Sequence, residues 1–263
     1  MPSGRKRSYA SRFSKKATPT FRRSKRKRFR RRKARTSYAK AFPKSMAVKL
    51  TYCDTIAIPN TDDGNAAYRF RLNSIFDPDM TGTGHQPRGH DQWATIYSKY
   101  CVVGAKVKVE PIYSSSSTGA GNTEVTIKGY IDDDITATNY SAEDIIELGM
   151  LGNKCQIVTI GQNAHGFERK VKPMTFKFGT KKFFGIKKSE QIINAVGIGQ
   201  GEATSLTGMQ HVGALFGTNP AKPAYLRLGC GGPTHDAQHP TVAARVTIEY
   251  SVIVHSPVEV ASS

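Results

Sequence analysis

The sequence predicts an all-β protein, a single eight-stranded jelly-roll sandwich preceded by a disordered, Arg-rich N-terminal arm. Apolar residues alternate with polar ones along several segments, as in strands that are buried on one face. The chain lacks the helices that parallel strands need between them, which favours antiparallel sheets. Met1–Lys44 contains 19 of the 39 Lys and Arg residues and none of the 20 Asp and Glu residues.

The arm is predicted to cover residues 1–44. Its apolar residues are too few for their burial to offset the entropy lost on ordering the segment, so we expect it to be disordered when free. Residues 45–263 carry the other 20 basic residues and all 20 acidic ones, which gives this part no net charge. It is long enough to bury one core, and we expect it to form the jelly-roll domain.

Three segments show the clearest period-two alternation: Val48–Ile58, Val103–Glu110 and Val246–Val254. In the second, Val103, Ala105, Val107 and Val109 are expected on one face. Weaker patterns bring the predicted strands to eight, at Tyr68–Ile75, Val125–Ile131, Gln156–Ile160, Val171–Phe178 and Ala224–Leu228.

Two short helices are expected among the strands. Ala142–Leu148 follows Ser141, a suitable N-cap, and has Glu143 and Asp144 in its first turn, where acidic residues favour the helix dipole. The second predicted helix is Gln92–Tyr100.

The four cysteines, Cys53, Cys101, Cys155 and Cys230, are far apart and form no CxxC pair. This spacing indicates buried free thiols rather than a zinc site or a disulfide framework. No run of about 20 apolar residues is present, so we expect no membrane insertion. No apolar segment follows Arg5-Lys6-Arg7, which argues against a secretory signal.

The arm has the chemistry of a nucleic-acid-binding segment. Arg and Lys bind phosphates through charge, and the aromatic residues interspersed with them can stack on unpaired bases without reading sequence. No sequence-reading motif is visible. The predicted binding residues are Arg5, Lys6, Arg7, Arg12, Lys15, Lys16, Arg22, Arg23, Lys25, Arg26, Lys27, Arg28, Arg30, Arg31, Arg32, Lys33 and Arg35.

The densest part of the arm is also typical of a nuclear localisation signal. Its basic residues are Lys25, Arg26, Lys27, Arg28, Arg30, Arg31, Arg32 and Lys33.

The sequence predicts no enzyme, no cofactor and no bound metal. Gly197–Glu202 lacks the third glycine of a dinucleotide fingerprint, and no nucleophile motif is found. Two groups, His85–His90–Asp91 and His235–Asp236–His239, lie in Gly- and Pro-rich loops without metal-site spacing, so hydrogen-bonding or interface roles are expected. Asp132–Asp134 follows a strand, where a turn is expected and a divalent cation is the alternative.

Lys170–Lys188 mixes Lys with Phe176, Phe178, Phe183 and Phe184. Two interpretations stay open: a surface that faces nucleic acid, or a strand–turn–strand whose charges lie in solvent.

Residues Arg69–Asp79, Thr81–Pro87, Asp91–Trp93 and Tyr97–Tyr100 resemble the capsid proteins of circovirus-like, circular single-stranded DNA viruses. No resemblance extends beyond Gly161. The resemblance implies a jelly roll that self-assembles into a small icosahedral shell around single-stranded DNA, in the virion and, during assembly, in the host nucleus. It implies that Arg22–Arg35 points towards the inside of the shell and binds host nuclear import receptors. It also implies that Thr81–Trp93 is an ordered loop of the shell.

The charge division agrees with this expectation. A neutral domain packs against copies of itself without repulsion. With about sixty copies, the arms would bring on the order of a thousand positive charges to offset genome phosphates. The alternative is a cellular nucleic-acid-binding protein of ribosomal or chromatin type with a basic extension, in which we would expect a further basic face on the folded domain.

Overall fold

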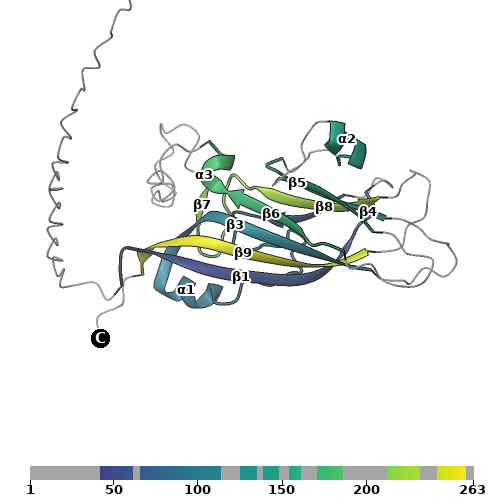
Figure 1. Ribbon diagram of the computed structural model, residues 1–263. Coiled ribbons are helices and arrows are strands. Elements are labelled where there is room, and N and C mark those ends of the chain that lie inside the picture. Colours follow the sequence, from purple (N-terminus) through teal and green to yellow (C-terminus); the bar gives the residue numbers. More distant parts are fainter. Residues whose placement is uncertain are drawn as a thin grey trace, which may run out of the picture. The chain divides into compact units, whose positions relative to one another are not determined.

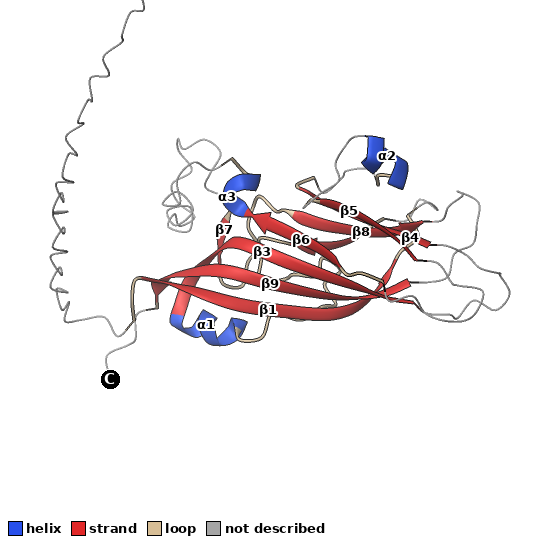
Figure 2. Ribbon diagram, viewed as in Figure 1, coloured by secondary structure: helices blue, strands red, loops and turns tan. Residues whose placement is uncertain are grey.

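The computed structural model describes residues 42–61, 66–113, 125–134, 139–147, 154–160, 171–185, 212–231 and 242–258. All of them belong to one compact unit, Ala41–Ser263. Two antiparallel sheets face each other in this unit (Figures 1 and 2). Residues 1–41 lie outside the described ranges, so the boundary at residue 44 stays a prediction.

The first sheet, called sheet A here, has the strand order β1-β9-β3-β6, and a short strand β7 also pairs with β3. The bounds of its strands are β1 Ser45–Ile58, β3 Tyr97–Tyr113, β6 Met174–Gly179, β7 Gly213–Leu215 and β9 Val242–Pro257.

The second sheet, sheet B, has the order β2-β8-β4-β5. Its strands are β2 Tyr68–Arg71, β4 Val125–Asp132, β5 Cys155–Ile160 and β8 Tyr225–Gly231. Leaving β7 aside, the chain crosses between the two four-stranded sheets at almost every connection. This interleaving is the jelly-roll topology, and it confirms the predicted fold class.

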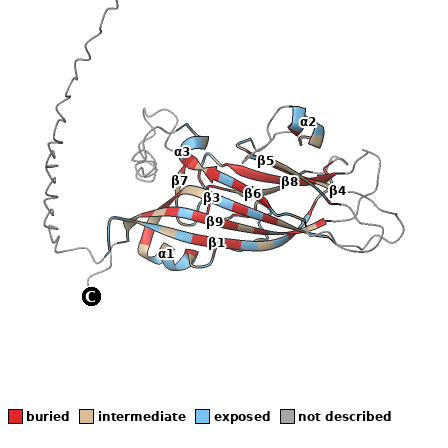
Figure 3. Cartoon of the chain, viewed as in Figure 1, coloured by how far each residue is buried: buried red, intermediate tan, exposed pale blue. Residues whose placement is uncertain are grey.

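The core lies between the sheets, and the period-two alternation explains how the strands fill it. Along β1 and β9, buried and exposed residues alternate (Figure 3). Even-numbered residues face the core, among them Tyr52 and Tyr250, which are fully buried. Strand β8 is buried along its whole length because its second face is covered as well.

One register prediction in β3 is wrong. The register shifts between Val102 and Gly104, which is a β-bulge. A bulge adds a residue to one strand and reverses the faces of the residues before it. Val102, Ala105, Val107 and Val109 therefore belong to the core, whereas the predicted Val103 is only partly buried.

A side chain links the two sheets at one edge. Gln156 of β5 donates from Nε2 to the carbonyl oxygen of Thr175 at 2.7 Å and accepts from the Thr175 N–H at 2.8 Å. The side-chain amide thus replaces a neighbouring strand for the edge strand β6 and protects a backbone that would otherwise invite wrong pairing.

The helices agree in part with the prediction. Helix α2 covers Ala142–Glu147, and Ser141 caps it as expected, since its Oγ accepts the Asp144 N–H at 3.0 Å. Helix α1 covers His90–Ile96, so Gln92–Tyr100 was placed too late, and β3 begins at Tyr97. Helix α3, Thr180–Phe183, was not predicted.

All four cysteines are free, and three of them are buried. The expectation of burial is wrong for Cys53, which is exposed. It occupies an odd-numbered position of β1, and these positions face away from the core.

Candidate nucleic-acid interface

The predicted binding residues Arg5–Arg35, with the import run Lys25–Lys33, lie outside the described residues. The segment that follows them is described, and we call Phe42–Lys44 the root of the arm. The root therefore shows how the folded domain holds the segment that joins it to the arm.

Hydrogen bonds hold the root against β3 and β9. The Tyr97 hydroxyl donates to the carbonyl oxygen of Pro43 at 3.1 Å, and the Ser256 N–H donates to that of Lys44 at 3.1 Å. Ser98 Oγ in turn donates to the Ser256 carbonyl oxygen at 3.0 Å. Ser256 has a φ of 59°, in the left-handed region that side chains other than Gly rarely adopt. Its neighbours hold this unusual backbone in place.

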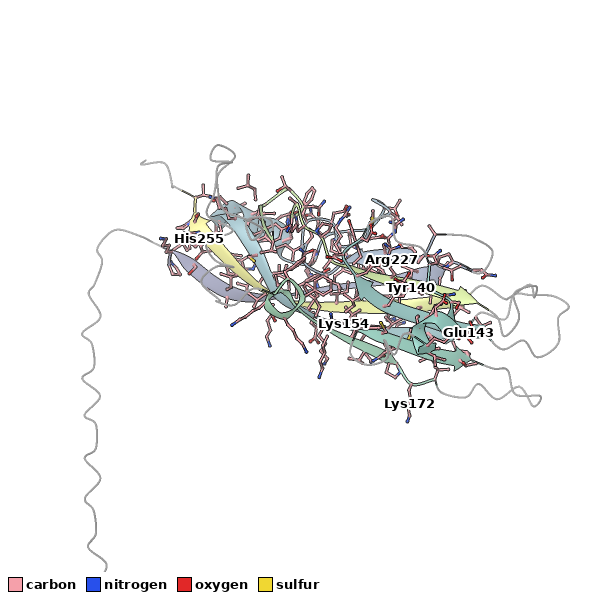
Figure 4. The ribbon with its side chains drawn as sticks, turned by 90° about the horizontal axis from the view of Figure 1, so that it is seen from above. Tyr140, Glu143, Lys154, Lys172, Arg227 and His255 are labelled. Atoms are coloured by element: carbon pink, nitrogen blue, oxygen red, sulfur yellow. The ribbon has the colours of Figure 1, made fainter. Side chains whose placement is uncertain are left out.

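The root has a positive environment. The pKa of His255 is lowered mainly by burial and further by Lys44 and Lys99. His255 is therefore neutral near pH 7, and its Nδ1 lies 2.6 Å from Ser256 Oγ. Figure 4 labels His255 at the opposite end of the sandwich from Tyr140 and Glu143.

The odd-numbered residues of β1 and β9 face outward together with the even-numbered residues of β3 that follow the bulge. We call this surface of sheet A the outer basic face. Residues that pair across β1, β9, β3 and β6 form rows on this face. One row contains Lys49, Ser251 and Gly104, and the next contains Thr51, Glu249, Lys106 and Lys177. The basic side chains outnumber the acidic ones on this face: Lys49, Lys106, Lys108, Lys177 and Arg245 against Glu110 and Glu249.

One acidic residue of this face is paired with a lysine. Lys108 Nζ lies 2.5 Å from Glu110 Oε1. The pKa of Glu110 is lowered chiefly by this hydrogen bond and to a smaller extent by Arg245. Sequence reasoning missed the face as a whole, although its signal was present: the polar positions of Val103–Glu110 include Lys106 and Lys108.

Neither of the two interpretations of Lys170–Lys188 describes the whole segment. Phe176 and Phe178 are buried in the core, and Phe183 and Phe184 pack against it, so these rings do not form a stacking surface. Lys177 does point outward and belongs to the outer basic face. The second half of the segment begins with helix α3 rather than the expected strand.

The first histidine group has structural contacts. His85 stacks on Tyr52 with ring centroids 4.7 Å apart. His90 is buried, its Nδ1 lies 3.0 Å from Asp91 Oδ1, and Phe216 contacts its ring edge-on. The second group, His235–Asp236–His239, lies outside the described residues, as does Gly197–Glu202.

The aspartates Asp132–Asp134 are engaged by an arginine. Arg227 Nε lies 2.6 Å from Asp132 Oδ2, and Arg227 Nη2 donates to the carbonyl oxygen of Asp134. Burial raises the pKa of Asp132, and Arg227 opposes that rise. This contact favours the turn over the alternative of a cation site.

Two kinds of feature, a metal cluster and a membrane-spanning helix, are absent from the described residues. No group of three or more His, Cys, Asp or Glu side chains in that part of the chain is arranged to hold a metal ion. No helix within it is both long and apolar enough to cross a bilayer.

Comparison with known proteins agrees with this picture. The model of the circovirus capsid protein family matches residues 18–222, which is more than half of the chain. No curated protein matches.

Similar solved structures come from several viruses. The decameric BFDV capsid protein is 12% identical, with 80% of this chain and 99% of that chain covered and a TM-score of 0.37. A chain of the Desmodium yellow mottle tymovirus structure is 12% identical, with 86% of this chain and 95% of that chain covered and a TM-score of 0.39. The semi-empty particle of Macrobrachium rosenbergii nodavirus is 8% identical, with 85% and 100% covered and a TM-score of 0.42.

The family match spans the end of the arm and most of the jelly-roll domain. It includes Arg69–Tyr100, the part of the sequence that resembles circovirus-like capsid proteins. The chain therefore belongs to the circovirus capsid protein family.

Proposed function

We propose that this capsid protein self-assembles into a small icosahedral shell of about sixty copies and packages single-stranded DNA without reading its sequence. The single observation that carries the proposal is the division of charge between Met1–Lys44, with 19 basic and no acidic residues, and a neutral remainder. The arm supplies cations for phosphate, and the neutral domain packs beside its copies without repulsion.

The binding residues in this proposal are the 17 Arg and Lys residues between Arg5 and Arg35. The run Lys25–Lys33 has a second role in it, as the signal that host import receptors bind. The outer basic face is a feature that the cellular alternative also predicts, but membership of a capsid family favours a structural role in the virion.

The first test asks whether the protein forms closed particles. Full-length protein is examined by negative-stain electron microscopy, and the absorbance ratio of the same fraction is measured. We expect uniform closed particles that carry nucleic acid. Small oligomers alone, in low and moderate salt with single-stranded DNA supplied, would contradict the proposal.

The second test separates the two roles of the arm. In one variant all 17 residues are changed to Gln, and in a matched variant the order of residues 1–44 is shuffled at constant composition. The logarithm of the association constant for single-stranded DNA falls linearly with the logarithm of the salt concentration, and each phosphate contact contributes ~0.7 to the steepness of this line. We therefore expect the slope of the first variant to be smaller in magnitude than the wild-type slope by on the order of ten. The shuffled arm keeps DNA binding and loses nuclear import. Equal DNA binding by wild type and the neutralised variant would rule out the arm.

A further inference from the structure

The centre of the outer basic face contains a hollow of about 360 Å³, whose charged lining residues are three lysines and one acidic residue, Glu249. Lys49 of β1, Lys106 of β3 and Lys177 of β6 are all exposed and border this hollow. Side chains from three different strands therefore bring positive charge to one place.

The strand register brings two of these lysines side by side. Lys106 and Lys177 are direct cross-strand partners in the β3–β6 pair. Like charges directly opposite each other destabilise a sheet. Glu249 lies opposite Lys106 on the other side, yet no ion pair between these two is found among the described contacts. Glu249 offsets part of the charge of the three lysines, and an anion in the hollow would offset the remainder.

One lining residue of the hollow, Gly104, has no side chain. Gly104 and Gly179 are paired across β3 and β6, and Ser251 flanks Gly104. A Cβ atom on Gly104 would lie 2.9 Å from the carbonyl oxygen of Phe178, so this position excludes any side chain without a backbone shift. The surface at this point stays low enough for an extended chain to lie between the lysines.

We propose that the outer basic face is a second binding surface for the sugar-phosphate backbone of single-stranded DNA, with Lys49, Lys106 and Lys177 as its phosphate ligands. The inference rests on the proposed function of the arm. Charge complementarity selects a polyanion as the occupant. The aromatic rings nearest the hollow, Phe178 and Tyr250, are buried, so the face binds phosphate and does not stack bases. Lys44 of the root and Lys99 of β3 add positive charge near His255 on the same sheet.

The test uses the full-length chain and a fluorescent 30-mer of thymidine. The variant K49Q/K106Q/K177Q is compared with K172Q/K181Q/K182Q, which removes the same charge from exposed lysines off this face. We expect the first variant to lose ~2 from the salt slope, about 0.7 for each lysine, and the second to keep the wild-type slope. The single change K177Q is expected to remove about 0.7 and covers the case in which the triple variant does not fold.

Equal slopes for wild type and the outer-face variants would overturn this inference and leave the arm proposal standing. Failure of the wild type itself to bind the oligonucleotide would overturn both. An unchanged slope together with loss of closed particles would identify the face as a contact between copies, which also contradicts the inference.

A second measurement needs no variant. Lysine acetylation of the native full-length protein is compared with and without the oligonucleotide. We expect protection of Lys49, Lys106 and Lys177 and none of Lys172, which is exposed and precedes strand β6. Acetylation of all four at unchanged rates would contradict the proposal.

Discussion

The outer surfaces of the two sheets are built in opposite ways. On sheet B, helix α2 covers the end of the sheet, and its fully buried Ile145 packs with Tyr130 and Cys155 in a small second core. On sheet A, the corresponding surface is exposed and carries Lys49, Lys106 and Lys177 around a hollow. Sheet B is thus buried on both faces at β8 and along most of β4, whereas the long strands β1 and β9 of sheet A are buried on one face only.

The charged residues follow the same division. On sheet B, Lys128 and Arg227 are almost completely buried, at 3% and 2% exposure, and Arg227 is paired with Asp132. On sheet A, the basic side chains reach solvent. A buried charge needs its partner, because removing that partner strongly lowers the stability of the fold. An exposed charge has little effect on stability and is available to a binding partner. The buried set therefore has a structural role, and the exposed set is available for the binding role proposed above.

The largest effect is expected at Arg227. The change R227M leaves the carboxylate of Asp132 without its partner in a mostly buried site, and we expect a loss of about 3–5 kcal/mol in unfolding free energy. R245M, at an exposed arginine on sheet A, is the matched control and should stay within about 0.5 kcal/mol of wild type. Denaturant unfolding of both variants measures the difference in unfolding free energy. Equal losses of stability in R227M and R245M would contradict the proposed difference between the charges of the two sheets.

The Arg227 effect also depends on pH. Burial already raises the pKa of Asp132, and removing Arg227 takes away the contact that opposes this rise. A carboxyl group whose pKa is raised on folding stabilises the protein below its unfolded pKa, and this stability is lost as pH rises through the folded value. R227M should therefore approach wild type near pH 4 and fall further below it as pH rises to 7.

A smaller effect is expected under helix α2. I145V removes one buried methylene group and should lower the unfolding free energy by about 0.5–1.5 kcal/mol. The next residue, Ile146, is 58% exposed, so I146V makes the same chemical change in the same helix without burial. We expect it to be close to neutral. If I145V were as neutral as I146V, the second core would not stabilise the protein.

The smallest effect is expected at the lysine pair, and it has the opposite sign. K177T removes the charge opposite Lys106, so the unfolding free energy at low salt should rise by at most about 1 kcal/mol. K106T should act in the same direction, and the double variant should gain less than the sum, since either change already relieves the repulsion. A loss of stability on K177T would mean that this lysine supports the fold.

Periodicity predicted the long strands well because alternation is a direct record of which face is buried. Val48–Ile58 and Val246–Val254 lie inside β1 and β9 for this reason. The three-residue strand β7 and the four-residue helix α3 are too short to produce a pattern. The bulge at Val102–Gly104 was missed because a register shift depends on the partner strand.

The same limit applies to the binding surface. The charge of the arm is a local property of the sequence, so its residues could be named directly. The outer basic face joins Lys49, Lys106 and Lys177 from three strands that are far apart in the chain. Only the pairing order brings them together, and periodicity does not determine that order.

The attachment of the arm has a mechanical consequence. Ser45, the first residue of β1, is paired with His255, and β1 and β9 remain in register from there to Ile58 and Val242. A pull on the arm along β1 shears this ladder and loads its hydrogen bonds together, which resists extraction. A pull across the strand meets first the bonds of Tyr97 and Ser256 to the root. If the protein packages DNA in a shell as proposed, tension on the arm would reach the folded domain through these few contacts.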